Sequence, residues 1–163
     1  MRMKSHIIFF FFFIASSALA QLSAQNEALR QESMVLDLEE VWSNEEEGAL
    51  IQSLQEFERA TKSKLLIISV GSMENFSDFD QYALYLLDKH NFHQKLDKNG
   101  LALVFSGGLR KIHLNTEMER RKIVEDSVYQ RIVNDLLIPS FKEGDYQQGI
   151  ERSVSELLRV YNN

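Results

Sequence analysis

The residues best suited to chemistry are oxygen donors in and beyond two short loops of the sequence. Five of them are candidate metal ligands: Asp97, Asn99, Glu117, Glu119 and Asp126. Carboxylate and amide oxygens are what a hard cation such as Ca²⁺ prefers, at about 2.3 to 2.6 Å. The residue types therefore indicate a candidate calcium site, and ordinary solvated loop residues without a ligand are the alternative.

A predicted β-hairpin would bring these two loops together. It begins with the apolar run 101–105, reverses at Gly107-Gly108 and continues through 109–114, which alternates between polar and apolar residues after Arg110. The strands of a hairpin are antiparallel. The loop entering the first strand, 96–99, and the loop leaving the second, 115–119, are therefore expected at the same end of the sheet, with Asp126 reaching in from the next helix.

Other patterns of chemistry are absent or have simpler explanations. The chain has no cysteine, which excludes cysteine nucleophiles. It also lacks the GxSxG, GxxxxGK[ST] and HExxH motifs. Asp78-Phe79-Asp80 resembles the paired aspartates of phosphotransferases, but it opens a predicted helix, which favours helix capping. His90 and His93, with Asp97, form an alternative transition-metal set, although a histidine near a helix C-terminus also complements the helix dipole.

The N-terminus has the pattern of a secretory signal. A basic start precedes the apolar stretch 7–14, and Ala18-Leu19-Ala20 supplies small residues before a cleavage site. Residues 1–20 are thus a predicted signal peptide, followed by a polar lead-in at 21–34, and the expected location is periplasmic or secreted. An uncleaved anchor is the alternative, but the stretch is shorter than the ~20 residues of a membrane span. No later segment is apolar enough to span a membrane.

The charge balance is acidic. The formal net charge is −6, and removing the two basic residues of the signal makes it −8. Nucleic-acid backbones are bound by clustered Lys and Arg, so a nucleic-acid partner is not expected. The short run Arg120-Arg121-Lys122 is surrounded by glutamates and is best interpreted as a solvated helix face.

Hydrophobic periodicity predicts one α/β domain over residues 35–163. The first expected elements are a helix at about Asn44–Thr61, begun by a Ser43/Glu46 capping box, and a buried strand at Leu65–Val70. A helix opened by Ser77 or Asp78 then leads to the hairpin. After the hairpin we expect a helix over 124–137 that kinks or ends near Pro139, and a last helix begun by Asp145. The strand, helix and strand before the hairpin form a right-handed parallel crossover. The predicted fold is a three-layer α/β/α sandwich with a small mixed sheet.

Several segments in this order resemble the TPM domain family. They are Val35-Leu36-Asp37, Ser43–Glu47, Thr61–Lys64 leading into LLIISV, Tyr82-Ala83-Leu84, Asn99-Gly100-Leu101, Asp126, Ile138–Phe141 and Gly144-Asp145-Tyr146. The resemblance implies an α/β/α fold on the extracytoplasmic side of a membrane. It also implies divalent metal binding, often of calcium, for some members, and acid phosphatase activity has been attributed to the plant relatives.

The chain departs from this family at its loop after the hairpin. The family typically carries Gly-Tyr-Gly-Leu-Glu there, whereas an ungapped match places Glu117-Met118-Glu119-Arg120-Arg121. Both glycines are lost, and Arg121 replaces a carboxylate, although Glu117 and Glu119 could compensate. The family's Trp-Gly pair after the second helix reads His90-Asn91.

Three functions are compatible with this sequence. The first is an extracytoplasmic binding or accessory domain for an unidentified protein partner, with a calcium site at one end of the sheet. The second is a weak, metal-assisted acid phosphatase that uses the same carboxylates. The third is a structural interaction domain without a ligand.

Overall fold

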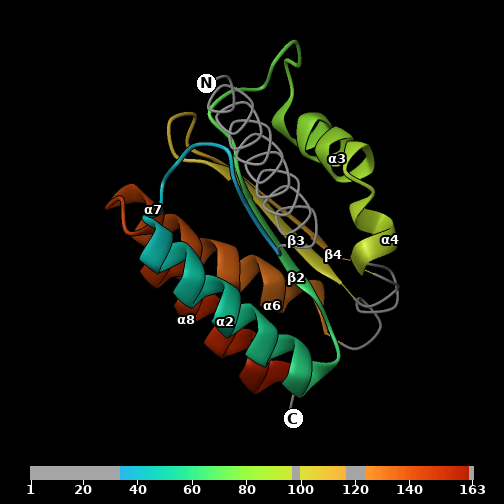
Figure 1. Ribbon diagram of the computed structural model, residues 1–163, viewed down its shortest axis with the longest axis vertical. Helices are drawn as coiled ribbons and strands as arrows, with labels where there is room; N and C mark the ends of the chain where they lie inside the picture. Colours follow the sequence, from blue (N-terminus) through green and yellow to red (C-terminus); the bar gives the residue numbers. More distant parts are fainter. Residues whose placement is uncertain (1–33, 97–99, 117–123, 162–163) are drawn as a thin grey trace, which may run out of the picture. The chain divides into compact units, whose positions relative to one another are not determined.

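The computed structural model describes residues 34–96, 100–116 and 124–161. Met34–Asn163 is one compact unit. Its elements, shown in Figure 1, are β1 (Val35–Asp37), α2 (Asn44–Thr61), β2 (Leu65–Ser69), α3 (Phe79–Lys89), α4 (Phe92–Leu96), β3 (Leu101–Ser106), β4 (Lys111–Thr116), α6 (Asp126–Arg131), the π-helix η2 (Ile132–Leu137), α7 (Ile138–Lys142) and α8 (Tyr146–Tyr161). None of the helices in this part of the chain combines the length and apolarity that a membrane crossing needs.

The four strands form one mixed sheet in the order β1-β2-β3-β4. β1 pairs with β2 and β2 with β3 in parallel, while β3 and β4 are antiparallel. The mixed sheet and its hairpin confirm the prediction. The sequence did not predict β1 as a strand, because three residues are too few to display a period.

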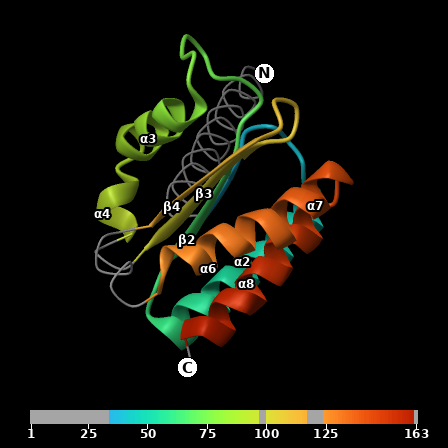
Figure 2. The ribbon, with the colours of Figure 1, turned by 180° about the vertical axis from the view of Figure 1, so that it is seen from behind.

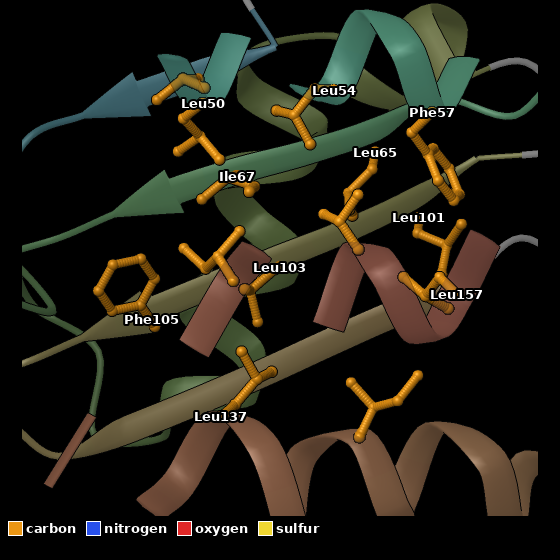
Figure 3. Packing of buried hydrophobic residues seen from close by; sticks show 14 of the residues in the cluster. Leu50, Leu54, Phe57, Leu65, Ile67, Leu101, Leu103, Phe105, Leu137 and Leu157 are labelled. Carbon is orange, nitrogen blue, oxygen red and sulfur yellow. The ribbon is translucent and has the colours of Figure 1, made fainter. Parts of the chain in front are cut away.

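Alternation along the strands creates two cores. Ile67, Leu103 and Phe105 belong to the core that includes α2, α8 and the helices after the hairpin, whereas Ile68 and Val104 belong to the core beneath α3 and α4. Figures 1 and 2 show these helix layers on opposite faces of the sheet. Figure 3 shows the first core from close by, with leucine and isoleucine side chains between strands and helices. The three-layer α/β/α prediction is therefore confirmed.

The two parallel crossovers have opposite hands. The sheet order advances in one direction from β1 to β3, but α2 packs on one face and α3 on the other. Parallel crossovers are right-handed in the great majority of proteins, and only one of these two can obey that rule. The loops that leave β1 and β2 consequently diverge to opposite sides of the sheet.

Capping residues begin the three longest helices where the sequence predicts. Ser43 and Glu46 form both bonds of a capping box at α2. The Asp78 carboxylate accepts a hydrogen bond from the Gln81 backbone amide at 2.8 Å, and the Asp145 carboxylate accepts one from Gln148 at 3.0 Å. Asp78 is thus a helix cap, as expected from its position before an apolar stripe.

The chain stays helical across Pro139, where a kink or an end was predicted. The π-helical turn η2 precedes the proline, and the Ile138 amide bonds to the Val133 carbonyl, five residues back. Pro139 then lies in the first turn of α7. Pro139 has no amide hydrogen to donate, and the wider π-turn before it accommodates this break in the hydrogen-bond ladder.

Candidate functional site

The starts and ends of the hairpin strands define the first candidate site, which we call the loop end. Leu101, the first residue of β3, pairs with Thr116, the last residue of β4. Gly100 precedes the pair and packs against Leu96, because a Cβ at Gly100 would lie 2.3 Å from the Cβ of Leu96. The antiparallel pairing on which the predicted calcium site depends is therefore present in the described strands.

Only one predicted metal ligand lies within the described residues. Asp97, Asn99, Glu117 and Glu119 lie outside them, so their convergence stays a prediction. Asp126 is exposed in the first turn of α6. Within the described ranges, no group of three His, Asp or Glu side chains is arranged to hold a metal.

Asp126 is not used as a helix cap. Residue Glu125 occupies the N-cap position without a side-chain capping bond, and its carboxylate instead accepts a 3.2 Å bond from the Ser127 hydroxyl. Val124, just before, is buried and anchors the start of the helix in the core. Asp126 is therefore a solvent-exposed carboxylate two residues after a point at which the chain is fixed in the core.

The opposite end of the sheet, which we call the hairpin end, is closed by a glutamate. The Glu39 carboxylate accepts hydrogen bonds from the backbone amides of Gly107 at 2.9 Å and Gly108 at 2.8 Å. The turn itself spans residues 107–110, with the Arg110 amide bonded to the Gly107 carbonyl at 3.3 Å. Glu39 thus satisfies two adjacent backbone donors of the turn.

The glycines of this turn supply space. Neither has a positive φ, and the left-handed residue of the turn is Arg110, at φ 54°. A Cβ at Gly107 would lie 2.1 Å from the Tyr146 hydroxyl, and one at Gly108 would lie 3.2 Å from a Glu39 carboxylate oxygen. The sequence correctly predicts the reversal, but the reason for the glycines is close packing.

A second carboxylate at the hairpin end is also occupied by internal bonds. Asp37 accepts hydrogen bonds from the backbone amides of Val41 and Trp42 at 3.2 and 3.1 Å, and from the Ser69 hydroxyl. The Glu39 amide in turn donates to the Ser69 hydroxyl at 3.0 Å. The carboxyl ends of β1, β2 and β3 are therefore joined by one polar network, whose acceptors serve the fold.

Aromatic rings pack beneath this network. The Phe105 ring is centred 5.7 Å from Trp42, 4.7 Å from Phe141 and 5.5 Å from Tyr146. Aromatic pairs at such distances add to the stabilisation from burial. The hairpin end is accordingly a packed and hydrogen-bonded part of the fold.

A histidine links the outer strand β4 to α3. Nδ1 of His113 lies 2.8 Å from a carboxylate oxygen of Asp80. Nε2 of the same ring is buried and has no hydrogen-bond partner among the residues described. His90, by contrast, ends α3 and stacks on Phe92, with ring centres 5.5 Å apart.

Sequence reasoning missed the Glu39 and His113 contacts. Glu39 lies 69 residues from Gly108, and Asp80 lies 33 from His113. A Gly-Gly turn does signal two backbone donors in need of an acceptor. No local pattern, however, indicates which of the many carboxylates in the chain would provide it.

Comparison with known proteins places the chain in a family. A family model described as the TPM domain matches residues 35–160. A search of the curated proteins finds no match.

Solved structures give the same fold. The N-terminal domain of a P. gingivalis protein, solved by NMR, has a TM-score of 0.67 and 22% identity over 80% of this chain and 82% of its own. The BA42 protein of Bizionia argentinensis gives 0.65 and 15% identity over 73% and 80%. The N-terminal domain of the cg2496 protein of Corynebacterium glutamicum gives 0.60 and 10% identity over 77% of each chain. With the family match over most of the sequence, these observations show that the chain belongs to the TPM domain family.

Proposed function

We propose that this chain is an extracytoplasmic TPM domain that acts as a binding or accessory module and takes a divalent cation, calcium, at its loop end. The observation that carries the proposal is the Leu101–Thr116 pairing, which supports convergence of the segments on either side. The exported location rests on the predicted signal peptide at residues 1–20, which lie outside the described residues. The partner protein remains unidentified.

The chemistry of the donor set fits calcium. The proposed ligands Asp97, Asn99, Glu117, Glu119 and Asp126 all offer oxygen. Six to eight oxygens at flexible geometry suit Ca²⁺, whereas a transition metal would favour nitrogen or sulfur donors. Asp126, solvent-exposed and beside the buried Val124, can approach such a site without disturbing the core.

The two ends of the sheet support the choice of the loop end. At the hairpin end, Asp37 and Glu39 already accept hydrogen bonds from the backbone or from Ser69. Taking these carboxylates for a metal would leave backbone donors without acceptors, which costs about 1 to 3 kcal/mol for each buried group. Asp126, the one proposed ligand among the described residues, does not cap its helix.

A calcium titration of residues 21–163, followed by backbone amide NMR, tests the proposal. We expect shifts confined to 97–100 and 115–127, and Asp126→Asn should weaken calcium binding about 10-fold or more, because it removes a charged ligand. Asp135→Asn is the matched control, since Asp135 is also exposed but lies a few turns away in η2. The control should bind calcium as the native chain does.

Two outcomes would decide against this function. The dissociation constants of extracellular calcium modules are about 0.1 to 1 mM. If about 10 mM calcium caused no amide shifts, the structural interaction domain without a ligand would be the function that fits. Release of phosphate from an aryl phosphate, reduced at least about 10-fold by Asp126→Asn, would instead support the metal-assisted acid phosphatase.

A further inference from the structure

The two edges of the sheet are protected unequally. β1 is only three residues long. β4 is six residues long and pairs with β3 in one continuous register without a bulge. It contains no proline, and Lys111 at its start is its only Lys, Arg, Asp or Glu. Short strands, bulges, prolines and inward charges are among the ways in which proteins prevent edge pairing, and β4 itself, among the described residues, has almost none of them.

Apolar side chains lie on both faces of this edge. On one face, Ile112 and Leu114 are only partly buried against the main core. On the other, Asp80 of α3 contacts His113, and Leu84 follows one helical turn later, 45% exposed. Since residues four apart share a helix face, Leu84 lies on the side of α3 that reaches β4.

We propose that β4 pairs antiparallel with β4 of a second copy of this chain, with His113 opposite His113. The two four-stranded sheets then become one sheet of eight strands about a two-fold axis, and each copy contributes the same surface. This inference is independent of the proposed calcium site.

The sequence of β4 is self-complementary in this register. With His113 opposite its own copy, Ile112 faces Leu114 of the other chain, and Lys111 faces Asn115. On one face of the joined sheet, the cross-strand pair Ile112–Leu114 is apolar. On the other face, the cation of Lys111 lies opposite the neutral amide of Asn115, so no two lysines oppose each other. Each His113 ring is directed to Asp80 of its own α3, which keeps the two rings from competing for one position.

The interface is small, so the dimer should be weak. One strand pair over residues 111–115, with Leu84 at its side, falls in the size class of transient complexes. We expect dissociation constants between about 10 μM and 1 mM, as is typical of weak encounters.

Opposite charges at one position test the register. In residues 21–163, Asn115→Lys places a lysine opposite Lys111 of the other copy, and Asn115→Glu places a carboxylate there. Each dimer contains two such pairs, so sedimentation equilibrium should show a Kd about 2- to 30-fold weaker for the lysine variant and tighter by a similar factor for the glutamate variant.

A charge swap and an isotope-filtered measurement complete the test. Lys111→Glu combined with Asn115→Lys again places opposite charges face to face, so its Kd should be close to that of Asn115→Glu. Each variant's amide spectrum checks that the monomer is folded. In a mixture of labelled and unlabelled chains, we expect contacts between copies at His113. The proposal would be overturned if the chain is a monomer at all concentrations up to about 1 mM. It would also be overturned if the dimer has the same Kd in the native chain and in all three variants. The first result would also be obtained if β4 pairs only with an extended segment of another protein.

Discussion

The two ends of the sheet differ in what their carboxylates contact. At the hairpin end, Glu39 and Asp37 accept hydrogen bonds from backbone and hydroxyl donors, and Phe105 packs among three other aromatic rings. At the loop end, Leu101 and Thr116 terminate a regular antiparallel pair of strands, and the proposed ligand Asp126 is exposed to solvent.

This difference teaches where a ligand is to be expected. A carboxylate that satisfies backbone donors is costly to remove, because it leaves those donors unpaired. Such a residue contributes to stability. A carboxylate with no duty in the fold can be substituted at little cost to stability. Substitutions at the hairpin end should therefore change stability without changing calcium binding, and Asp126→Asn should do the reverse.

The largest effect is expected from truncating the aromatic centre of the hairpin end. Phe105→Ala removes a fully buried ring, and such truncations cost about 3 to 5 kcal/mol of unfolding free energy. Urea unfolding of residues 21–163 measures the loss. Leu109→Ala, at the same end but 38% exposed, should change stability by less than about 0.5 kcal/mol. Similar losses for the two variants would contradict the packing described here.

A smaller loss is expected when a methyl group is added to the turn. Gly107→Ala places a Cβ against the Tyr146 ring, with calculated approaches of 2.1 Å to the hydroxyl and 2.7 Å to Cζ. Overpacking of this kind costs about 1 to 3 kcal/mol. Gly71→Ala is the control, because nothing lies within 4 Å of its added Cβ.

Removing the Tyr146 hydroxyl distinguishes overpacking from other causes. The double variant Gly107→Ala with Tyr146→Phe should recover part of the lost stability, since the closest atom is gone. If it recovers nothing, the hydroxyl is not the obstacle, and the ring carbon Cζ, at 2.7 Å from the added Cβ, is.

Loss of one hydrogen-bond acceptor from the turn should lower the free energy of unfolding by a still smaller amount. Glu39→Gln keeps the shape of the side chain but directs an amide donor at one of the two glycine amides that the carboxylate now accepts. A lost bond with an unsatisfied, partly buried donor costs about 1 to 2 kcal/mol. Glu40→Gln, next in the chain, is the matched control and should lie within about 0.5 kcal/mol of the native protein. Equal stability of both variants would show that the Glu39 contact contributes nothing.

Local patterns predicted most of the fold but not the tertiary polar contacts. Helix α2 and its capping box, the stripe of α3 and the β3–β4 hairpin follow from period and capping, which act over a few residues. The strand β1 and the short helix α4 were missed because three and five residues display no full period. Near Pro139, where a kink or an end was predicted, the π-turn η2 ends and α7 begins.

The candidate site was less accessible to sequence reasoning than the fold. The strand pairing at the loop end could be predicted from the hairpin, whereas the ligand geometry depends on loops whose conformation no period encodes. The Glu39 and His113 contacts join residues far apart in sequence, and any of several carboxylates could have made them. Residue type limits the possible acceptors to the carboxylates, and only the tertiary structure shows which carboxylate makes each contact.

The smallest effect is expected from a partly exposed ion-pair cluster that joins α6 to α8. Glu156 of α8 bonds to Arg159 at 2.7 and 2.8 Å and also contacts Arg131 of α6. Chiefly through the Arg159 hydrogen bonds, the pKa of Glu156 falls to about 2. A carboxyl whose pKa is lower in the folded state than its ordinary 4.5 stabilises the fold fully above about pH 4.5 and loses that contribution as the pH falls toward 2.

The pH dependence of Glu156→Gln tests this contribution. The difference in urea midpoint between the native chain and the variant should be largest above about pH 5 and should shrink as the pH falls toward 2. Salt should reduce it, because the pair is exposed to solvent. Glu143→Gln, an exposed glutamate in the turn before α8, provides a control whose difference should stay small at every pH. A Glu156→Gln difference that is constant from pH 7 to 2 would mean that packing of the side chain, rather than its charge, joins α6 to α8.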